Sequence, residues 1–537
     1  MKKKLLAVLI CLVMAVGLLP VTAFAAEGYD LYVNGEQFTS EKLSIACGEG
    51  TADFNPTANT LTLNNAVITL GGKSDESPKY GLRVVGNADL TIKLSGVNSI
   101  TLANGGGIFA DGGNVNYHIT GNGKLTVDVR WDALYTLTGN IEISDGADLD
   151  ITSAEGCGIT SYNKGNVSVD GAKVKVSAYY SAVNAKELTV KNQSTVTLEA
   201  SQENFNAVYM GDENGAGRIE ITDSELKATS YYPALYTEGN LTISGGKVEC
   251  TSTADSAIWT QGDILIRGDA KVITDGKYPM GGKSITVEAA DIDAKNTNEN
   301  NIPAIFDECV PAIADGYRLK YAQAVDDEGT KIDLLASGTQ YFALYKNVHF
   351  ITKAVYEVSF AVTPAELTNV VIKLDGQEIT GPVELEAGTY SVEVTADNCE
   401  PFSSDITVTA DAATHTQTIA MTYLPADYTK VDEAVAKAAA LSKDEYKDFS
   451  AVEAAVDAVI RGKNITEQDE VDAMAKVIED AIAALEKKPA EPKPGEDGQN
   501  PPTGDNAPIS LLALLFVSGA AAIGTTAVSQ KKKRLGR

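Results

Sequence analysis

Small, aliphatic and polar residues recur with a period of about 25 residues between Tyr80 and Met280. Each copy has a small residue, an aliphatic residue, a variable residue, a short gap, Gly-Asn and then an alternating strand, as in "ALYTLTGNIEI" and "ALYTEGNLTI". Spacings between successive small residues run from 23 to 27. The small residues are Gly81, Gly107, Ala133, Gly158, Ala182, Ala207, Ala234 and Ala257. A fixed period of this length predicts a stack of similar structural units.

Within each copy the pattern is that of short β-strands. Val, Ile and Thr alternate with polar residues, and Gly, Asn and Asp stand at the turns. The Leu-x-x-Leu-x-Leu framework of a leucine-rich repeat is missing, a propeller blade needs about 40 residues, and a sandwich has no fixed period. We therefore predict a mainly β chain built on a right-handed parallel β-helix, in which about ten coils each rise by ~4.8 Å.

Less regular segments flank the repeats, and we assign residues 26–353 to the β-helix with its caps. Residues 354–424 alternate around Asp-Gly and Ala-Gly turns, which predicts a small β-sandwich of antiparallel strands. Residues 425–488 are Ala-rich with apolar residues at three- and four-residue steps, which predicts a three-helix bundle. Residues 489–499 are rich in proline, which predicts an extended linker.

Both ends of the chain carry export features. Lysines, an apolar stretch and Ala23-Phe24-Ala25 predict a signal peptide over residues 1–25, cleaved between Ala25 and Ala26. Residues 500–537 begin with "NPPTG", continue with an apolar run from Ala507 to Val528 and end in a basic tail. The apolar run is long enough to span a bilayer as a transmembrane segment. The basic residues would stay on the cytoplasmic side.

This ordered tail resembles the cell-wall sorting signal of Gram-positive surface proteins. The resemblance implies that a sortase cuts between Thr503 and Gly504 and joins Thr503 to peptidoglycan. The protein would then be secreted and anchored to the cell wall, and only its precursor would contact the membrane. In addition, "LDGQEITGPVELEAGTYSVEVTADNCEP" resembles PEGA-type modules, and residues 425–488 resemble a FIVAR module.

Net charge and histidine content narrow the range of functions that the sequence allows. A net charge of −29 disfavours nucleic acid as a partner. Of three histidines only His118 lies in the repeats, and the arginines of the repeats fall at different places in their coils. We therefore expect no catalytic residues, no enzyme and no cofactor. Calcium is the one ion for which oxygen ligands are at hand, on the turn residues Asp145, Asp170 and Asp223.

Aromatic residues offer the best candidate site. Two positions after the small residues, a series that includes several aromatics should point outward, because the residues between them are inward aliphatics. A second series precedes the small residues. The predicted ligand-binding residues from both series are Tyr135, Tyr209, Tyr236, Trp259, Trp131 and Tyr232. Two interpretations stand: a ladder that only stabilises neighbouring coils, or an exposed surface on which sugar rings stack.

The whole arrangement resembles carbohydrate-binding β-helix proteins displayed on Gram-positive surfaces. The resemblance implies a non-catalytic, adhesin-like protein that binds a polysaccharide or a host glycan. Alternatives are a wall-anchored polysaccharide lyase or glycoside hydrolase, and an adhesin that binds protein.

Overall fold

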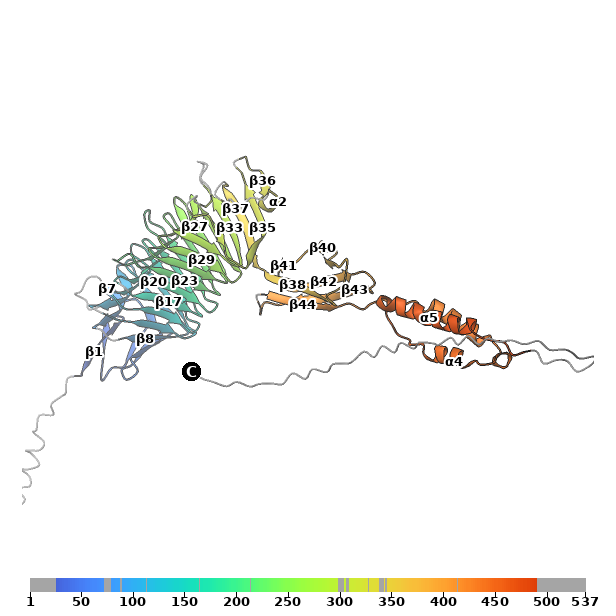
Figure 1. Cartoon of the computed structure of the whole chain (residues 1–537). Helices are drawn as coiled ribbons and strands as arrows, with labels where there is room; N and C mark the ends of the chain where they lie inside the picture. Colours follow the sequence, from blue (N-terminus) through green and yellow to red (C-terminus); the bar gives the residue numbers. More distant parts are fainter. Residues whose placement is uncertain are drawn as a thin grey trace, which may run out of the picture. The chain divides into compact units, whose positions relative to one another are not determined.

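The computed structural model describes residues 26–489, apart from residues 72–78, 87–88, 113, 164, 213, 298–303, 306–308, 327, 338–341, 343–344 and 413. The chain is mainly β, with 54% strand and 11% helix. It divides into two compact units, which meet in the sequence at Leu424 and Pro425. The first unit contains a parallel β-helix of about nine turns, as the repeats predict. Its strands follow one another coil by coil in Figure 1.

Three sheets run the length of the β-helix. From β7 to β31, neighbouring strands of the first sheet are parallel and come from successive coils. This sheet has 11 strands in the order β2 (Glu36–Thr39), β1 (Gly28–Val33), β7 (Lys79–Val85), β10 (Gly105–Asp111), β13 (Leu134–Thr136), β16 (Ile159–Ser161), β19 (Val183–Ala185), β22 (Val208–Met210), β25 (Leu235–Thr237), β28 (Ser256–Thr260) and β31 (Tyr278–Gly281).

The second and third sheets have 13 strands each. The second contains β3 (Ser44–Cys47), β4 (Gly50–Asn55), β5 (Thr60–Asn64), β8 (Leu90–Ser95), β11 (Tyr117–Thr120), β14 (Ile141–Ser144), β17 (Asn166–Asp170), β20 (Glu187–Lys191), β23 (Arg218–Thr222), β26 (Asn240–Ser244), β29 (Asp263–Arg267), β32 (Ser284–Val287) and β34 (Ala312–Ile313). The third contains β36 (Lys331–Asp333), β35 (Tyr317–Val325), β37 (Asn347–Ala354), β33 (Ala290–Asn296), β30 (Ala270–Gly276), β27 (Lys247–Ser252), β24 (Glu225–Ser230), β21 (Thr195–Ala200), β18 (Lys173–Ala178), β15 (Asp148–Ser153), β12 (Lys124–Val129), β9 (Val97–Leu102) and β6 (Val67–Ile68).

Alternate side chains of every coil fill the interior. In β26, Leu241 and Ile243 are fully buried, whereas Asn240, Thr242 and Ser244 point outward. The small residue of each repeat and the aliphatic residue after it are also buried, as the sequence predicts. Coil stacking therefore joins these side chains into one continuous apolar core.

The Gly-Asn pair of the repeat lies at the corner between the first and second sheets. A Cβ on Gly239 would lie 1.9 Å from the carbonyl oxygen of Gly217, a distance that no real contact allows. The Asn240 side chain then accepts a hydrogen bond of 2.9 Å from the backbone N–H of Asp263 in the next coil. Glycine is therefore needed for the close approach of coils, and asparagine bonds one corner to the next.

Antiparallel strands close both ends of the stack. At the start, β1 pairs antiparallel with β7, and β3, β4 and β5 pair antiparallel with one another. At the finish, β37 pairs antiparallel with β33 and with β35, and the short helix α2 (Leu334–Ser337) follows β36. These strands cover apolar core that an open coil would expose to water.

Two small sheets follow the β-helix in the first unit. One contains β41 (Val383–Leu385), β38 (Tyr356–Thr363) and β44 (Thr414–Ala420), and the other contains β40 (Gln377–Ile379), β39 (Val371–Leu374), β42 (Gly388–Thr395) and β43 (Phe402–Val408). They share a core that includes Val358, Val392 and Val394, consistent with a small sandwich. The expectation of antiparallel strands throughout is wrong, because β38 and β44 pair in parallel. These are the first and last strands of the module, so no hairpin constrains their direction.

The second unit holds three helices, α3 (Thr429–Ala439), α4 (Ser450–Asp457) and α5 (Gln468–Ala483). Two short 3₁₀ turns, η3 (Lys443–Glu445) and η4 (Ile465–Glu467), lie between them. Their shared core includes Val431, Val452, Val471 and Ile478. This arrangement is consistent with the predicted three-helix bundle.

Several predicted segments lie outside the described residues. These are the signal peptide (1–25), all but the first residue of the linker (489–499), and the sorting signal with its apolar run (500–537). Within the described ranges, no helix combines the length and the apolar character needed to cross a membrane.

Candidate functional site

The outward series predicted on the first sheet forms one column across the coils. Cα pairings place Arg83, Phe109, Tyr135, Thr160, Asn184, Tyr209, Tyr236 and Trp259 opposite one another in successive strands. Most of these side chains are partly exposed, and Thr160 is buried. The aliphatic residues before them point inward, so period-two alternation predicts this column correctly.

Two aromatic stacks occupy this column. Tyr80 from the neighbouring position, Phe109 and Tyr135 form the first stack, with ring centroids 3.9 and 5.0 Å apart. The second contains Tyr209 and Tyr236, whose centroids are 5.4 Å apart and whose planes differ by 14°. Thr160 and Asn184 separate the two stacks. The rings of each stack therefore turn their faces toward each other.

A groove lies beside the second stack. Its volume is about 560 Å³, and it is lined by Asn206, Tyr209, Tyr232, Pro233, Tyr236, Asp255, Ser256, Trp259 and Tyr278. Four of the six residues predicted to bind ligand, namely Tyr209, Tyr232, Tyr236 and Trp259, are thus brought together. The sequence did not single out the polar residues of the lining, because nothing in the repeat marks a corner position such as Asp255 as special.

The groove runs between two columns of side chains. One is the outward series. The other lies at the corner that precedes each strand of the first sheet, and it contains the second predicted series, the aromatic residues that come before the small residues. In this corner column Tyr180 and Phe205 pack with ring centroids 4.6 Å apart, in the coils that carry Asn184 and Tyr209 in the other column. The corner column therefore carries an aromatic side chain, Tyr180, in the coil where the outward column has Asn184.

Hydrogen bonds fix the two stacked tyrosines. The Tyr209 hydroxyl donates to Glu238 Oε1 at 2.8 Å, and Gln261 Nε2 donates to the Tyr236 hydroxyl at 2.7 Å. Burial, together with the neighbouring Glu238 carboxylate, raises the pKa of Tyr209 to about 12. The Tyr209 phenol therefore stays neutral, and the hydrogen bonds hold both rings in one orientation before any ligand arrives.

Tyr232 differs from the stacked tyrosines. Its side chain is 40% exposed, and no aromatic ring of the described chain packs on it. Its sequence neighbour Tyr231 is also 40% exposed but does not line the groove. Tyr232 is thus the aromatic residue of the groove best placed to offer a ring face to a ligand.

Asp255 and Ser256 supply polar groups at the groove. Asp255 Oδ1 accepts hydrogen bonds from the backbone N–H of Ser256 at 2.6 Å and from its hydroxyl at 3.2 Å. On the same lining, Asn206 Nδ2 donates to the carbonyl oxygen of Pro233 at 3.0 Å. Carboxylate, amide and hydroxyl groups beside aromatic rings form a surface that can both pack against and hydrogen-bond a polyhydroxylated ligand.

The other two predicted residues lie away from the groove. Tyr135 belongs to the first stack, three strand steps or roughly 14 Å along the sheet from Tyr209. Trp131 is 38% exposed, and the guanidinium carbon of Arg130 lies 4.9 Å from its ring centroid. They face the same side of the β-helix but do not line this cavity.

Metal ligands do not gather in the described ranges, where no group of three or more His, Cys, Asp or Glu side chains could hold an ion. Of the aspartates considered for calcium, Asp145 and Asp223 have positive φ angles of 54° and 45°. Asp170 accepts a hydrogen bond from Asn192 at 2.6 Å and pairs with Lys191 at 3.1 Å. Turn geometry and local partners explain these residues.

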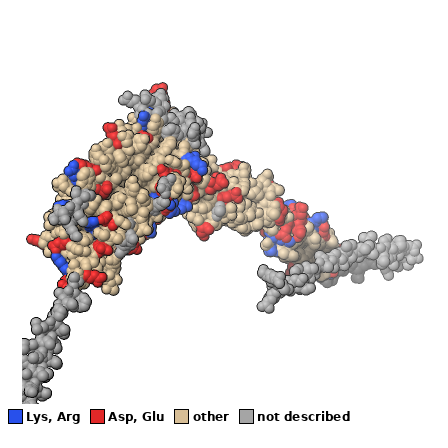
Figure 2. Space-filling view, turned by 90° about the vertical axis from the view of Figure 1, so that its left-hand side faces the viewer, with Lys and Arg blue, Asp and Glu red and all other residues tan. Residues whose placement is uncertain are grey.

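The groups considered for catalysis are dispersed. His118 lies on the second sheet, where its Nε2 is 3.0 Å from Ser144 Oγ and 4.0 Å from a Glu142 oxygen. Arginines of the repeats form ion pairs on different coils, among them Arg130 with Glu155 and Arg218 with Glu187. On the face shown in Figure 2, acidic and basic residues are scattered over the β-helix.

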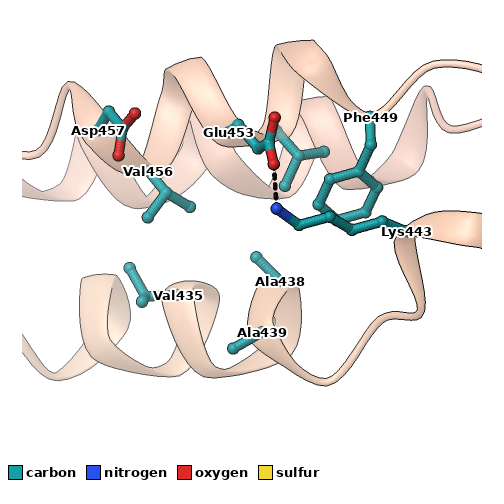
Figure 3. A pocket seen from close by; sticks show the side chains of 9 residues that line it. Val435, Ala438, Ala439, Lys443, Phe449, Glu453, Val456 and Asp457 are labelled. Carbon is teal, nitrogen blue, oxygen red and sulfur yellow. Dashed lines mark hydrogen bonds and ion pairs between the residues drawn. The ribbon is translucent and has the colours of Figure 1, made fainter.

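A second cavity, of about 510 Å³, lies between α3 and α4 in the helical unit. Figure 3 shows that Val435, Ala438, Ala439 and Val456 line it and that the Lys443–Glu453 ion pair lies next to Phe449. Apolar side chains dominate this surface, so it offers few partners to a hydroxylated ligand.

Comparison of the chain with protein-family models, with curated proteins and with solved structures finds no match.

Proposed function

We propose that this chain is a surface protein that binds carbohydrate through the groove on the first sheet of its β-helix. The observation that carries the proposal is the groove itself, where Tyr209, Tyr232, Tyr236 and Trp259 stand beside the Asp255 carboxylate. Aromatic rings pack against the C–H faces of sugars, and carboxylates accept hydrogen bonds from their hydroxyls. The preset orientation of Tyr209 and Tyr236 reduces the ordering that binding would otherwise require.

We propose binding without cleavage. Glycoside hydrolases generally place two carboxyl groups on either side of the bond that breaks. Among the described residues that line the groove, Asp255 alone carries a carboxylate, and the nearby Glu238 carboxylate accepts a hydrogen bond from Tyr209. The dispersed histidine and arginines likewise favour a binding protein over the lyase and hydrolase alternatives.

We further propose that the protein is exported and held on a Gram-positive cell wall. This part rests on the sequence of the two ends, above all on "NPPTG" followed by an apolar run and a basic tail. Along the sequence, the sandwich and the helical module would then separate the β-helix from the anchored Thr503.

Mass spectrometry of protein released from walls by a muramidase tests the anchoring. We expect a chain that begins at Ala26 and ends at Thr503 with a peptidoglycan fragment attached, because a sortase would cut before Gly504. A mature surface protein that retains Arg537 would contradict it.

Binding of the exported chain to a panel of polysaccharides and glycans tests the groove. We expect Tyr232→Ala to weaken binding about fivefold to tenfold, since one lost stacking contact removes about 1 kcal/mol. The melting temperature should change little, because Tyr232 is exposed. Binding is measured by calorimetry and stability by circular dichroism.

Tyr231→Ala is the matched control. It removes an equally exposed tyrosine at the neighbouring position, outside the groove, and should leave binding unchanged. Equal losses in both variants would refute the groove as the site. New reducing ends in the wild-type mixture would point to the hydrolase alternative instead.

A further inference from the structure

We infer that the groove selects uncharged glycans and discriminates against glycans that carry carboxylate or sulfate groups, with Asp255 as the main residue that sets this specificity. The inference rests on the proposed function and names the class of ligand for the same groove. Its basis is a local excess of negative charge in a site without lining cations.

Asp255 brings the first negative charge. Its carboxylate belongs to the groove lining, and among the described residues it receives hydrogen bonds from Ser256 alone, through the backbone N–H and the hydroxyl. In the described part of the chain, no lysine, arginine or histidine lies within ion-pair distance of this carboxylate. The charge therefore acts directly on any anion that enters the groove.

Glu238 brings the second negative charge, which contacts the groove lining through Tyr209. Its Oε1 accepts from the Tyr209 hydroxyl, and its Oε2 is buried without a hydrogen-bond partner among the described residues. No cation of the described chain pairs with Glu238 either. Both carboxylates thus contrast with many acidic residues elsewhere on the β-helix, such as Glu155 and Glu187, which pair with arginines.

Cations are sparse on this surface. None of the nine residues that line the groove is a lysine or an arginine. Lys277 lies close by, with its ammonium 5.5 Å from the centroid of the Tyr278 ring, where the π face attracts it. Sites that take acidic glycans need a cation that can pair with the carboxylate or sulfate, and Arg is the usual choice because it bonds both oxygens. This groove presents the opposite charge.

Uncharged sugars gain binding affinity from the same carboxylates. A hydroxyl group donates to carboxylate oxygens, and such charge-assisted hydrogen bonds are about twice as strong as neutral ones. A carboxylate or sulfate on the sugar would replace that attraction with repulsion at short range. We expect an anionic form of a bound glycan to bind about tenfold more weakly than the uncharged form, and less so at high salt.

Matched pairs of oligosaccharides test the inference on the whole exported chain. The probes are galacturonan oligomers with free or methyl-esterified carboxyls, and glucan oligomers with a C6 hydroxyl or a C6 carboxylate. Affinities are measured by calorimetry at low and at high salt. In any pair that binds, the uncharged member should bind about tenfold more tightly, and the difference should shrink as salt is added.

The variant Asp255→Asn tests whether Asp255 is responsible for the preference for uncharged glycans. Asparagine keeps an acceptor oxygen for Ser256 but removes the charge, so the preference within a pair should fall by severalfold while the melting temperature stays the same. Asp128→Asn is the control, because it removes one charge from an exposed position on β12 of the third sheet.

The outcomes separate the inference from the proposed function. If anionic members bind as well as uncharged ones, or if Asp255→Asn and Asp128→Asn behave alike, the charge selection is overturned while carbohydrate binding stands. If neither member of any pair binds and the glycan panel is also negative, the proposed function fails and the inference fails with it. Should Asp255→Asn unfold, the salt dependence of the wild-type preference still decides.

Discussion

Gly239→Ala should destabilise the β-helix by about 3 kcal/mol, at the upper end of the cost of overpacking. The added methyl group would lie 1.9 Å from the carbonyl oxygen of Gly217 in the preceding coil. That atom is backbone and cannot rotate away, so the two coils would have to separate at this corner. Thermal and urea unfolding, followed by circular dichroism of the sheet signal, measures the effect.

Gly388→Ala makes the same chemical change without the clash. The nearest atoms to its new Cβ are those of Tyr390, at 3.7 Å and beyond, which is ordinary contact. We expect this variant to keep the stability of the wild type. Equal stability of Gly239→Ala and the wild type would show that the coils do not approach as closely at this corner as the backbone indicates.

The glycine corner illustrates what the sequence can and cannot predict. The period of the repeat was enough to predict a parallel β-helix, and the small and aliphatic residues of the repeat are buried as expected. Gly-Asn was visible as part of the repeat, yet the structural reason for its glycine was not. A contact between Gly239 and the carbonyl oxygen of Gly217 depends on how two coils stack, which no single copy of the repeat encodes.

The aromatic column shows the same limit at the candidate site. Alternation along a strand decides which side of the sheet a residue faces, and this was enough to send Tyr209, Tyr236 and Trp259 outward. It does not decide how a ring turns about its side-chain torsions. The tyrosines stack on one another, so the faces that a sugar would need are partly taken, and the exposed ring of Tyr232 gains importance.

Asp255 could not be found from the sequence for a related reason. Its place beside the groove comes from the corner that leads into β28, and corners vary in length between copies, with spacings from 23 to 27 residues. Asp145 and Asp223, which the sequence offered as calcium ligands, lie at turns and have positive φ angles. Residue type alone did not distinguish an aspartate that lines the groove from an aspartate that stabilises a turn.

Tyr236→Ala should lower both glycan affinity and stability. The ring packs against Tyr209 with centroids 5.4 Å apart, and its hydroxyl accepts a hydrogen bond from Gln261. Loss of a half-buried aromatic side chain should reduce the free energy of unfolding by about 2 kcal/mol. Affinity should fall more than tenfold, because the change removes part of the groove wall and also the ring that stacks on Tyr209. Adding Trp259→Ala should deepen the loss of affinity.

A drop in both glycan affinity and stability could follow from damage to the coils alone. The control must therefore remove a stacked aromatic ring that lies outside the groove. Phe109→Ala meets this need, since Phe109 stacks between Tyr80 and Tyr135 in the same column and does not line the groove. We expect it to lower the melting temperature as Tyr236→Ala does while binding persists. Together with Tyr232→Ala, which should weaken binding at unchanged stability, the three variants separate the stabilising ladder from the ligand surface. If Phe109→Ala abolishes binding as well, affinity depends on the integrity of the whole sheet, and the groove has no special role.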